Sequence, residues 1–172
     1  MIHCFKLKQR IITLVKIILP SLNQFFIFLV YHVGENVMNK QIIRNAQNEI
    51  FYEANLNQEK GWIYINWIGD IEIEDVKRGT QAYLDLLAIS GCRKLLNDNS
   101  LLTSNFLEIN EWIEANVVPV AVQTGLRYMA HILSPKFIAR FSGIDLGLRM
   151  KPVEFHAFKE IKKAEKWLNS MD

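Results

Sequence analysis

Two neighbouring runs of apolar residues, separated by a short polar stretch, predict the first pair of strands in this chain. Residues 49–55 and 61–68 are rich in Tyr, Trp, Phe and Ile, which favour strands, and the polar connection 56–60 leads into Gly61. The pattern is typical of a β-hairpin. In the second arm both alternating sets of side chains are mostly bulky, so we expect both faces of the sheet to be covered, as when helices lie on each side.

After Gly69 the spacing of apolar residues changes to that of a helix, which Gly91 should end. The remaining elements are expected in the following order. A strand over 94–98 precedes a helix with Phe106, Ile109, Ile113 and Val117 on its inner stripe. The segment over 117–123 is interpreted as helix, with Pro119 in its first turn and Gly125 closing it, although its valines also favour a strand. Then follow a strand over 127–133, a short helix over 135–141, a strand over 153–158, and a final helix over 159–171 with Ile161, Ala164, Leu168 and Met171 on one stripe. The alternation predicts an α/β domain over residues 45–172.

The first 37 residues have a different pattern and are expected to lie outside that domain. Residues 11–33 are mostly apolar with Lys16 as their one formal charge, and they follow a basic start at residues 6–10. A membrane anchor is one interpretation, since about 20 apolar residues span a bilayer, but polar residues interrupt the segment. A cleaved signal peptide is less favoured because no small-x-small site follows. The favoured interpretation is that Met38 is the true start.

Charge and cysteine content narrow the classes of function. The net charge of +2 divides into +3 over residues 1–37 and −1 over the rest, so the predicted domain is nearly neutral and has no basic stripe for nucleic acid. Cys4 and Cys92 are far apart and lack the spacing of a zinc site or a redox pair. We therefore expect free thiols, no nucleic-acid partner and a cytoplasmic location, or a membrane-attached one if residues 11–33 are a genuine anchor.

Three short motifs follow one another along the predicted domain: Gly69 followed by Ile73-Glu74-Asp75, Trp112 with Gly125 before Arg127-Tyr128-Met129-Ala130, and Val153-Glu154-Phe155 leading to Ala164, Trp167 and Leu168. In this order the chain resembles the SpoIIAA-like fold shared by STAS domains and CRAL-TRIO lipid-binding domains, and it is most similar to uncharacterised bacterial STAS/Sec14-like proteins. The resemblance covers about residues 49–170. It implies a mixed, mostly parallel sheet with an N-terminal hairpin and flanking helices.

The best-understood proteins with this fold are anti-sigma factor antagonists, which switch on a phosphorylated serine in an Asp-Ser-Gly turn. Here the corresponding region, residues 98–105, has no such turn, and Ser104 or Thr103 stands nearest the switch position. The resemblance therefore names them as a possible phospho-switch. Their alternative role is to cap the next helix, which the residue types favour.

Polar residues follow several predicted strands, where an open parallel sheet binds its ligands. The candidate binding residues at this edge are Asp70, Asp98, Asn99, Ser100 and Ser134. Asp98 is the first to test, because its carboxylate would leave a central strand. Turn and cap chemistry explains the same residue types equally well.

Other groups of chemically active residues have structural interpretations that we favour. Glu108, Glu111 and Glu114 could suit a metal or an acid–base pair, but a solvated helix face is the simpler interpretation. His131 and His156 lie in predicted strands and could act as bases, although a structural histidine is more typical.

The sequence does not predict an enzyme. Ser104, a strand histidine and Asp98 could supply a nucleophile, a base and an orienting group, but no G-x-S-x-G elbow or Gly-rich phosphate loop accompanies them. Hydrolysis is the weakest hypothesis, and no cofactor or metal is expected.

The leading hypothesis is a non-enzymatic binding or regulatory module that engages a protein partner at the edge formed by residues 98–104. The alternative is a small carrier of lipid or another hydrophobic ligand, as the CRAL-TRIO relationship allows, which requires an apolar cavity of some hundreds of Å³. The residues nominated as its gate are Phe137, Phe141, Leu146, Leu148 and Met150.

Overall fold

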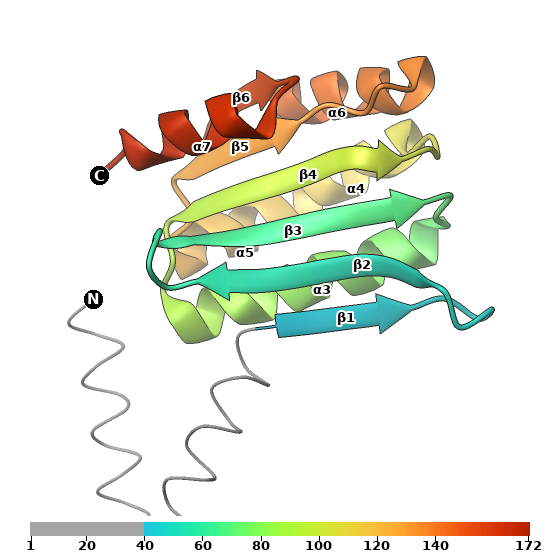
Figure 1. Ribbon diagram of the computed structural model, residues 1–172, viewed down its shortest axis with the longest axis horizontal. Helices are drawn as coiled ribbons and strands as arrows, with labels where there is room; N and C mark the ends of the chain where they lie inside the picture. The colour runs from blue at the N-terminus through green and yellow to red at the C-terminus, as the bar shows by residue number, and fades with distance from the viewer. Residues whose placement is uncertain (1–39) are drawn as a thin grey trace, which may run out of the picture. The chain divides into compact units, whose positions relative to one another are not determined.

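The strands of the sheet follow one another in space in the same order as in the sequence. The computed structural model describes residues 40–172, which form one six-stranded sheet with helices on both faces (Figure 1). Its strands are β1 (Lys40–Arg44), β2 (Ile50–Asn57), β3 (Trp62–Gly69), β4 (Lys94–Leu102), β5 (Tyr128–Ile132) and β6 (Glu154–Phe158).

The predicted hairpin is the pair β2 and β3, and a third strand lies beside it. β1 pairs with β2 and β2 with β3 in antiparallel fashion, whereas β3, β4, β5 and β6 are parallel neighbours. The fold is therefore mixed α/β with a mostly parallel sheet, as expected. The prediction missed β1, which begins at Lys40, upstream of the expected domain start at residue 45.

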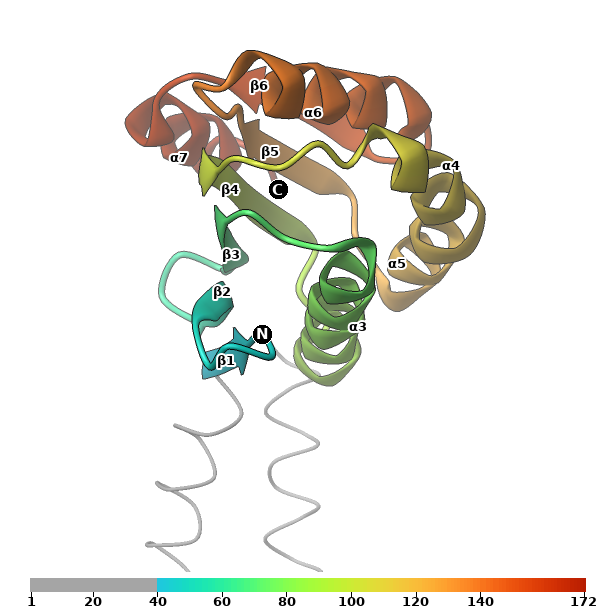
Figure 2. The same ribbon diagram turned by 90° about the vertical axis from the view of Figure 1, so that its right-hand side faces the viewer.

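Three helical segments cover one face of the sheet and one helix covers part of the other (Figure 2). The first face carries α3 (Ile73–Ser90), a continuous helical stretch made of η1 (Leu107–Ile109), α4 (Asn110–Trp112), η2 (Ile113–Val117) and α5 (Val118–Thr124), and then α6 (Phe137–Arg149). The second face carries α7 (Ile161–Asn169). The expectation of cover on both faces is confirmed.

Two helix ends were predicted correctly from their residue types. α3 ends at Gly91, which takes the left-handed conformation (φ 63°) that favours glycine and donates its N–H to the Leu87 carbonyl at 2.8 Å. The ambiguous segment over 117–123 is helical, with Pro119 in its first turn and Gly125 (φ 115°) after it. Pro119 lacks an N–H donor, and within the continuous helical stretch it lies just after the π-helical turn η2, where the regular hydrogen-bond pattern already changes.

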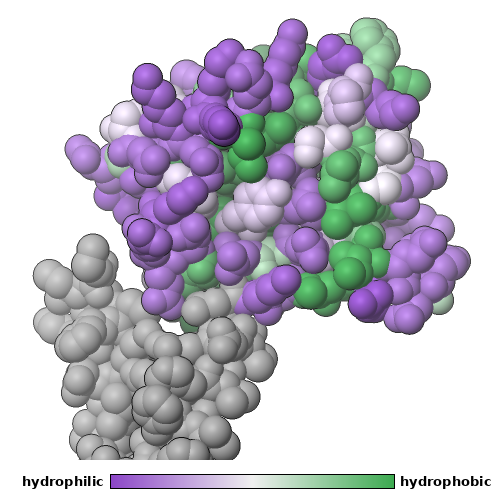
Figure 3. Space-filling model, in the orientation of Figure 1, coloured by the Kyte–Doolittle hydropathy of each residue, from purple (hydrophilic) through white to green (hydrophobic). Residues whose placement is uncertain are grey.

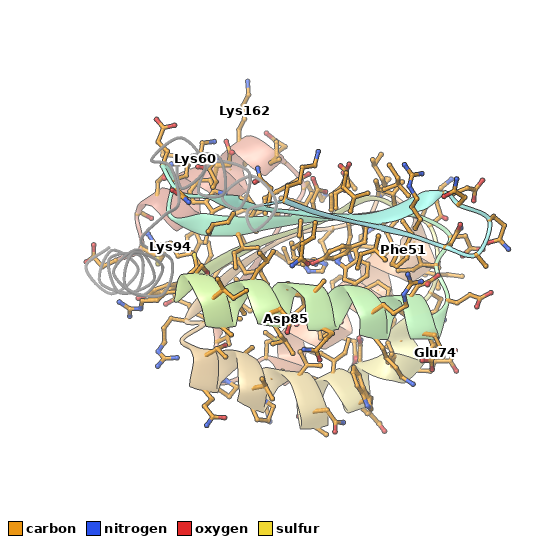
Figure 4. All side chains as sticks on the ribbon, turned by 90° about the horizontal axis from the view of Figure 1, so that it is seen from below. Phe51, Lys60, Glu74, Asp85, Lys94 and Lys162 are labelled. Carbon is orange, nitrogen blue, oxygen red and sulfur yellow. The ribbon has the colours of Figure 1, made fainter. Side chains whose placement is uncertain are left out.

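A large apolar core fills the space between the sheet and α3, α4, α5 and α6, and a smaller core lies under α7. Figure 4 shows Phe51 on the side of the sheet that faces α3 and Lys162 projecting from the opposite side. The smaller core consists of Trp62, Leu96, Ala130, Ile132, Ala164 and Leu168. Ala164 and Leu168 are completely buried, as the stripe on the final helix predicts, but Ile161, expected on the same stripe, is 41% exposed.

Two elements are longer than the sequence predicts. β4 continues to Leu102, beyond the expected end at residue 98, so Asn99 also lies inside the strand. α6 continues to Arg149, beyond the expected end at residue 141. Between residues 40 and 172 no helix combines the length and apolar character needed to cross a membrane. The predicted segment over 1–37, including the candidate anchor, lies outside the described residues.

Candidate functional site

Asp98 is a buried hydrogen-bond acceptor on the face of the sheet that carries α7. The Tyr64 hydroxyl donates to its Oδ2 at 2.9 Å and the Ser100 backbone N–H donates to its Oδ1 at 2.8 Å. The side chain is only 5% exposed. Burial, followed by the negative charge of Asp98, raises the pKa of Tyr64 well above its ordinary value, so the phenol remains a proton donor. These contacts give Asp98 a structural role.

On the opposite face of the sheet, four side chains from three strands form a buried polar network. Trp67 Nε1 donates to Asn97 Oδ1 at 2.8 Å. The Asn97 amide nitrogen lies 3.0 Å from Asn99 Oδ1 and 2.7 Å from His131 Nδ1. Because β3, β4 and β5 are adjacent, residues far apart in the sequence meet here within apolar surroundings.

The donors of the network fix the protonation state of His131. An indole nitrogen can only donate, so Asn97 must present its oxygen to Trp67 and its amide hydrogens to Asn99 and His131. His131 Nδ1 is then an acceptor, and the ring carries its proton on Nε2. Burial lowers the pKa of His131 to about 4, which agrees with a neutral ring. Nε2 is buried and has no hydrogen-bond partner among the described residues.

A cavity of about 40 Å³ lies beside this network, between the sheet and the helices. Asn97 and Asn99 line it together with Thr80 and Tyr83 of α3, and the rest of its lining is mostly apolar. Of the five residues nominated as a gate, Leu146 and Met150 line it. The space can hold a few water molecules at a polar floor. It is far smaller than the several hundred Å³ of a typical ligand pocket.

The other candidate residues at the strand ends mostly hold loops. Ser134 is buried: its hydroxyl donates to the Leu102 carbonyl at 2.7 Å and accepts from the Lys136 N–H at 3.1 Å. Ser104 accepts from the Ile71 N–H at 3.1 Å and is also buried. Asp70, Ser100 and Thr103 are exposed.

Neither Thr103 nor Ser104 caps the next helical segment. The N-cap position of η1 is Phe106, which makes no side-chain cap hydrogen bond, and Asn105 Oδ1 accepts the Leu107 N–H at 3.0 Å. Ser104 is engaged instead with Ile71 across the β3–α3 loop. As a phospho-switch Ser104 stays a prediction, but phosphorylation there would have to displace that contact.

The structure does not bring the nominal nucleophile, base and orienting group together. Asp98 and His131 lie on opposite faces of the sheet, because Asp98 follows Asn97 in β4 and successive side chains of a strand point to opposite sides. His156 stacks on Trp167 with ring centroids 4.6 Å apart. Over the part of the chain that the structure describes, no group of three His, Cys, Asp or Glu side chains could hold a metal ion.

Of the three glutamates over 108–114, Glu114 and Glu111 form part of an ion-pair network with α6. Arg149 Nη1 lies 2.9 Å from Glu114 Oε2, and its Nε lies 2.8 Å from Asp145 Oδ2, whereas Glu111 is more distant at 3.8 Å. Asn110 donates to Asp145 as well, and these hydrogen bonds lower the pKa of Asp145. The glutamates therefore form an acidic border along one side of α6. Only some of them are paired with Arg149.

The most unusual feature of the structure is the orientation of α6, which the sequence-based prediction missed. Its sheet-facing side consists largely of small residues, which include Ala139, Ser142 and Gly143. All of its large apolar residues except the buried Leu146 face outward: Phe137 (77% exposed), Ile138 (59%), Phe141 (55%), Ile144 (45%) and Leu148 (71%). We call these five residues the α6 stripe. The signal was present in the 4-3-4 spacing of residues 137, 141, 144 and 148, but the pattern alone does not tell which face of a helix is buried.

Small residues are required on the inner side because α6 lies very close to the sheet. A Cβ atom added at Gly143 would lie 2.6 Å from His131 Nε2, and one at Gly147 would lie 2.5 Å from Phe155 Cε1. A bulky side chain has no room at either position. By contrast, mostly hydrophilic residues cover the face seen in Figure 3, with narrower apolar bands between them.

No family model, curated protein or solved structure matches this chain. The function is therefore inferred from its own residues. What is established is the α/β class and its six-stranded, mostly parallel sheet, and the resemblance to SpoIIAA-like domains stays a prediction.

Proposed function

We propose that this protein is a non-enzymatic binding module of SpoIIAA-like type, which engages a protein partner through the α6 stripe. The observation that carries the proposal is the arrangement of α6, with small residues toward the sheet and large apolar residues toward solvent. The sequence placed the partner at residues 98–104 instead. Most of the polar candidates there are engaged in internal hydrogen bonds, so the stripe is the better-supported surface.

The size of the stripe supports a binding role. Its five side chains together expose on the order of 500 Å², which is near the upper end of the largest apolar patch on an ordinary monomer, and such patches are often functional. Single exposed apolar residues need no explanation, but a continuous row of them lowers solubility unless something covers it.

The carrier hypothesis has less support in this conformation. A lipid chain needs a cavity of hundreds of Å³, whereas the cavity beside Asn97 measures about 40 Å³. Three of the nominated gate residues, Phe137, Phe141 and Leu148, lie on the outer surface of α6. They are placed to meet another macromolecule.

Site-specific photocrosslinking in the native cell tests the proposal. A photoreactive residue replaces Phe141 in one version of the full chain and the exposed Lys162 of α7 in a control version. We expect a discrete protein adduct from position 141 that is absent from position 162 and is lost when Leu148→Ser is added. Adducts with lipid alone, or no adduct dependent on Leu148, would contradict a protein-binding role for α6.

A further inference from the structure

The surroundings of the α6 stripe differ in charge on its two sides. On one side lie Asp145 and the acidic ridge, by which we mean Glu108, Glu111 and Glu114. Arg149 is the cation paired with this group, and it is shared between Asp145, Glu114 and the more distant Glu111. Four carboxylates beside one guanidinium leave this border with a net negative charge. Glu111 is 83% exposed and therefore free to meet a ligand.

The contacts of α6 show that the ridge borders the stripe and does not lie beneath it. Asn110 Nδ2 donates to the Ser142 carbonyl and to Asp145 Oδ2, both at 2.9 Å, so the segment that carries the ridge runs along the Ser142–Asp145–Arg149 side of α6. The opposite side of the helix holds Gly147 against Phe155 of β6. A molecule lying on the stripe would therefore meet the ridge carboxylates along the flank that faces away from β6.

The shape of the stripe fits a second helix. Phe137, Phe141, Ile144 and Leu148 follow one another at spacings of four, three and four, which makes a nearly straight row about 17 Å long at the rise of an α-helix. An amphipathic helix presents anchors at the same spacing, and such helices commonly bind to apolar surfaces of this kind.

From these observations we propose that the partner contributes an amphipathic helix with Lys or Arg on one flank, which lies along α6 with its basic flank against the acidic ridge. This inference rests on the proposed protein-binding function and specifies its ligand. A membrane surface is a poorer occupant, because anionic headgroups would meet Glu108 and Glu111 with like charge. A second copy of the chain is also poorer, since the stripe exposes on the order of 500 Å², whereas a standard interface buries about 800 Å² on each partner.

Two synthetic peptides test the inference against the full-length chain. Both form an amphipathic helix with the same leucine stripe; one has lysines on one flank, and its twin has glutamates at the same positions. Fluorescence anisotropy should show the basic peptide binding at least about tenfold more tightly than the acidic twin, with an affinity that falls as salt rises. Phe141→Ser with Leu148→Ser should abolish binding of both peptides.

Charge reversal gives the decisive variant. Glu108→Lys with Glu111→Lys changes exposed residues and keeps the Arg149–Glu114 pair, so the fold should be preserved, which thermal unfolding checks. The preference should then reverse toward the acidic twin. Equal affinity for both peptides, or a preference that ignores the reversal, would overturn the proposed ligand. If neither peptide binds while the crosslink at position 141 persists, the ligand chemistry is wrong but the protein-binding function stands.

A membrane surface and a second copy of the chain, the other possible occupants of the stripe, would give different experimental results. Vesicles of phosphatidylcholine with phosphatidylglycerol should bind the wild type and the Phe141→Ser, Leu148→Ser variant equally; weaker binding by the variant would assign the stripe to lipid. Sedimentation velocity should give the same mass for both proteins. A dimer that is lost in the variant would assign the stripe to a second copy.

Discussion

His131 is held neutral by its neighbours as well as by burial. A proton on Nδ1 would point at the amide hydrogens of Asn97, and Asn97 cannot turn around because its oxygen accepts from Trp67. Protonation of the ring therefore has to break a hydrogen bond as well as bury a charge. One titratable side chain thus makes the folding of the whole sheet sensitive to acid.

The first prediction follows from the pKa of His131. The unfolded chain binds the proton with a pKa of about 6.5, whereas the folded protein binds it near 4. Between these values the unfolded state holds more protons, so the free energy of unfolding should fall by about 3 kcal/mol as the pH is lowered through this range. Urea unfolding at a series of pH values measures this slope.

Two histidine variants serve as controls for the acid sensitivity. His131→Gln should remove most of the slope between pH 6.5 and 4. His156→Gln should keep it, because His131 and its contacts are unchanged and His156 lies on the other face of the sheet. A slope that survives in His131→Gln would mean that another group is responsible.

At the scale of elements, most of the large apolar residues of α6 should be replaceable with little loss of stability, unlike those of an ordinary amphipathic helix. Phe141 is large but 55% exposed, so Phe141→Ser should change the free energy of unfolding by no more than about 0.5 kcal/mol. Leu146 is 6% exposed and lines the cavity, so Leu146→Ala should cost about 2 to 5 kcal/mol. Denaturant unfolding of both variants checks the orientation, which would be wrong if Phe141→Ser proved the more damaging change.

The sequence predicted the elements whose local pattern agrees with their place in the fold. The hairpin of β2 and β3 has β-formers on both faces, and α3 has a single apolar face with Gly91 at its end. For these, composition and spacing are sufficient because burial follows directly from them. For β4 and α6, composition and spacing are not sufficient. Which of their side chains are buried depends on contacts with residues that lie far away in the sequence.

Asn97 and Asn99 show why the buried polar network on β4 could not be predicted. Their residue types are typical of loops, and only Trp67 from β3 and His131 from β5 supply the partners that let them stay buried. The same limit applies to the candidate site: the sequence named Asn99 and His131 but neither of their network partners, Trp67 and Asn97. β1 was missed for a related reason, since its sequence, KQIIR, has only two apolar residues.

For the whole molecule, residues 40–172 form two apolar cores from their own side chains, one on each face of the sheet. A chain that begins at Met38 should therefore unfold in a single cooperative transition, with a midpoint in urea close to that of the full-length protein. Circular dichroism during urea unfolding of both chains tests this. A broad, non-cooperative transition in the shorter chain would show that residues 1–37 contribute to the fold.

The sequential strand order also has a consequence for how the protein is made. The strands are synthesised in their spatial order, so each can pair with its predecessor as it emerges from the ribosome, and α7 is made only after all six of them. Trp62 of β3 and Leu96 of β4, however, are covered by Ala164 and Leu168 of α7. Until α7 is made, the nascent sheet therefore exposes an apolar face, and a chain that stops before α7 would keep this face open to chaperones and proteases.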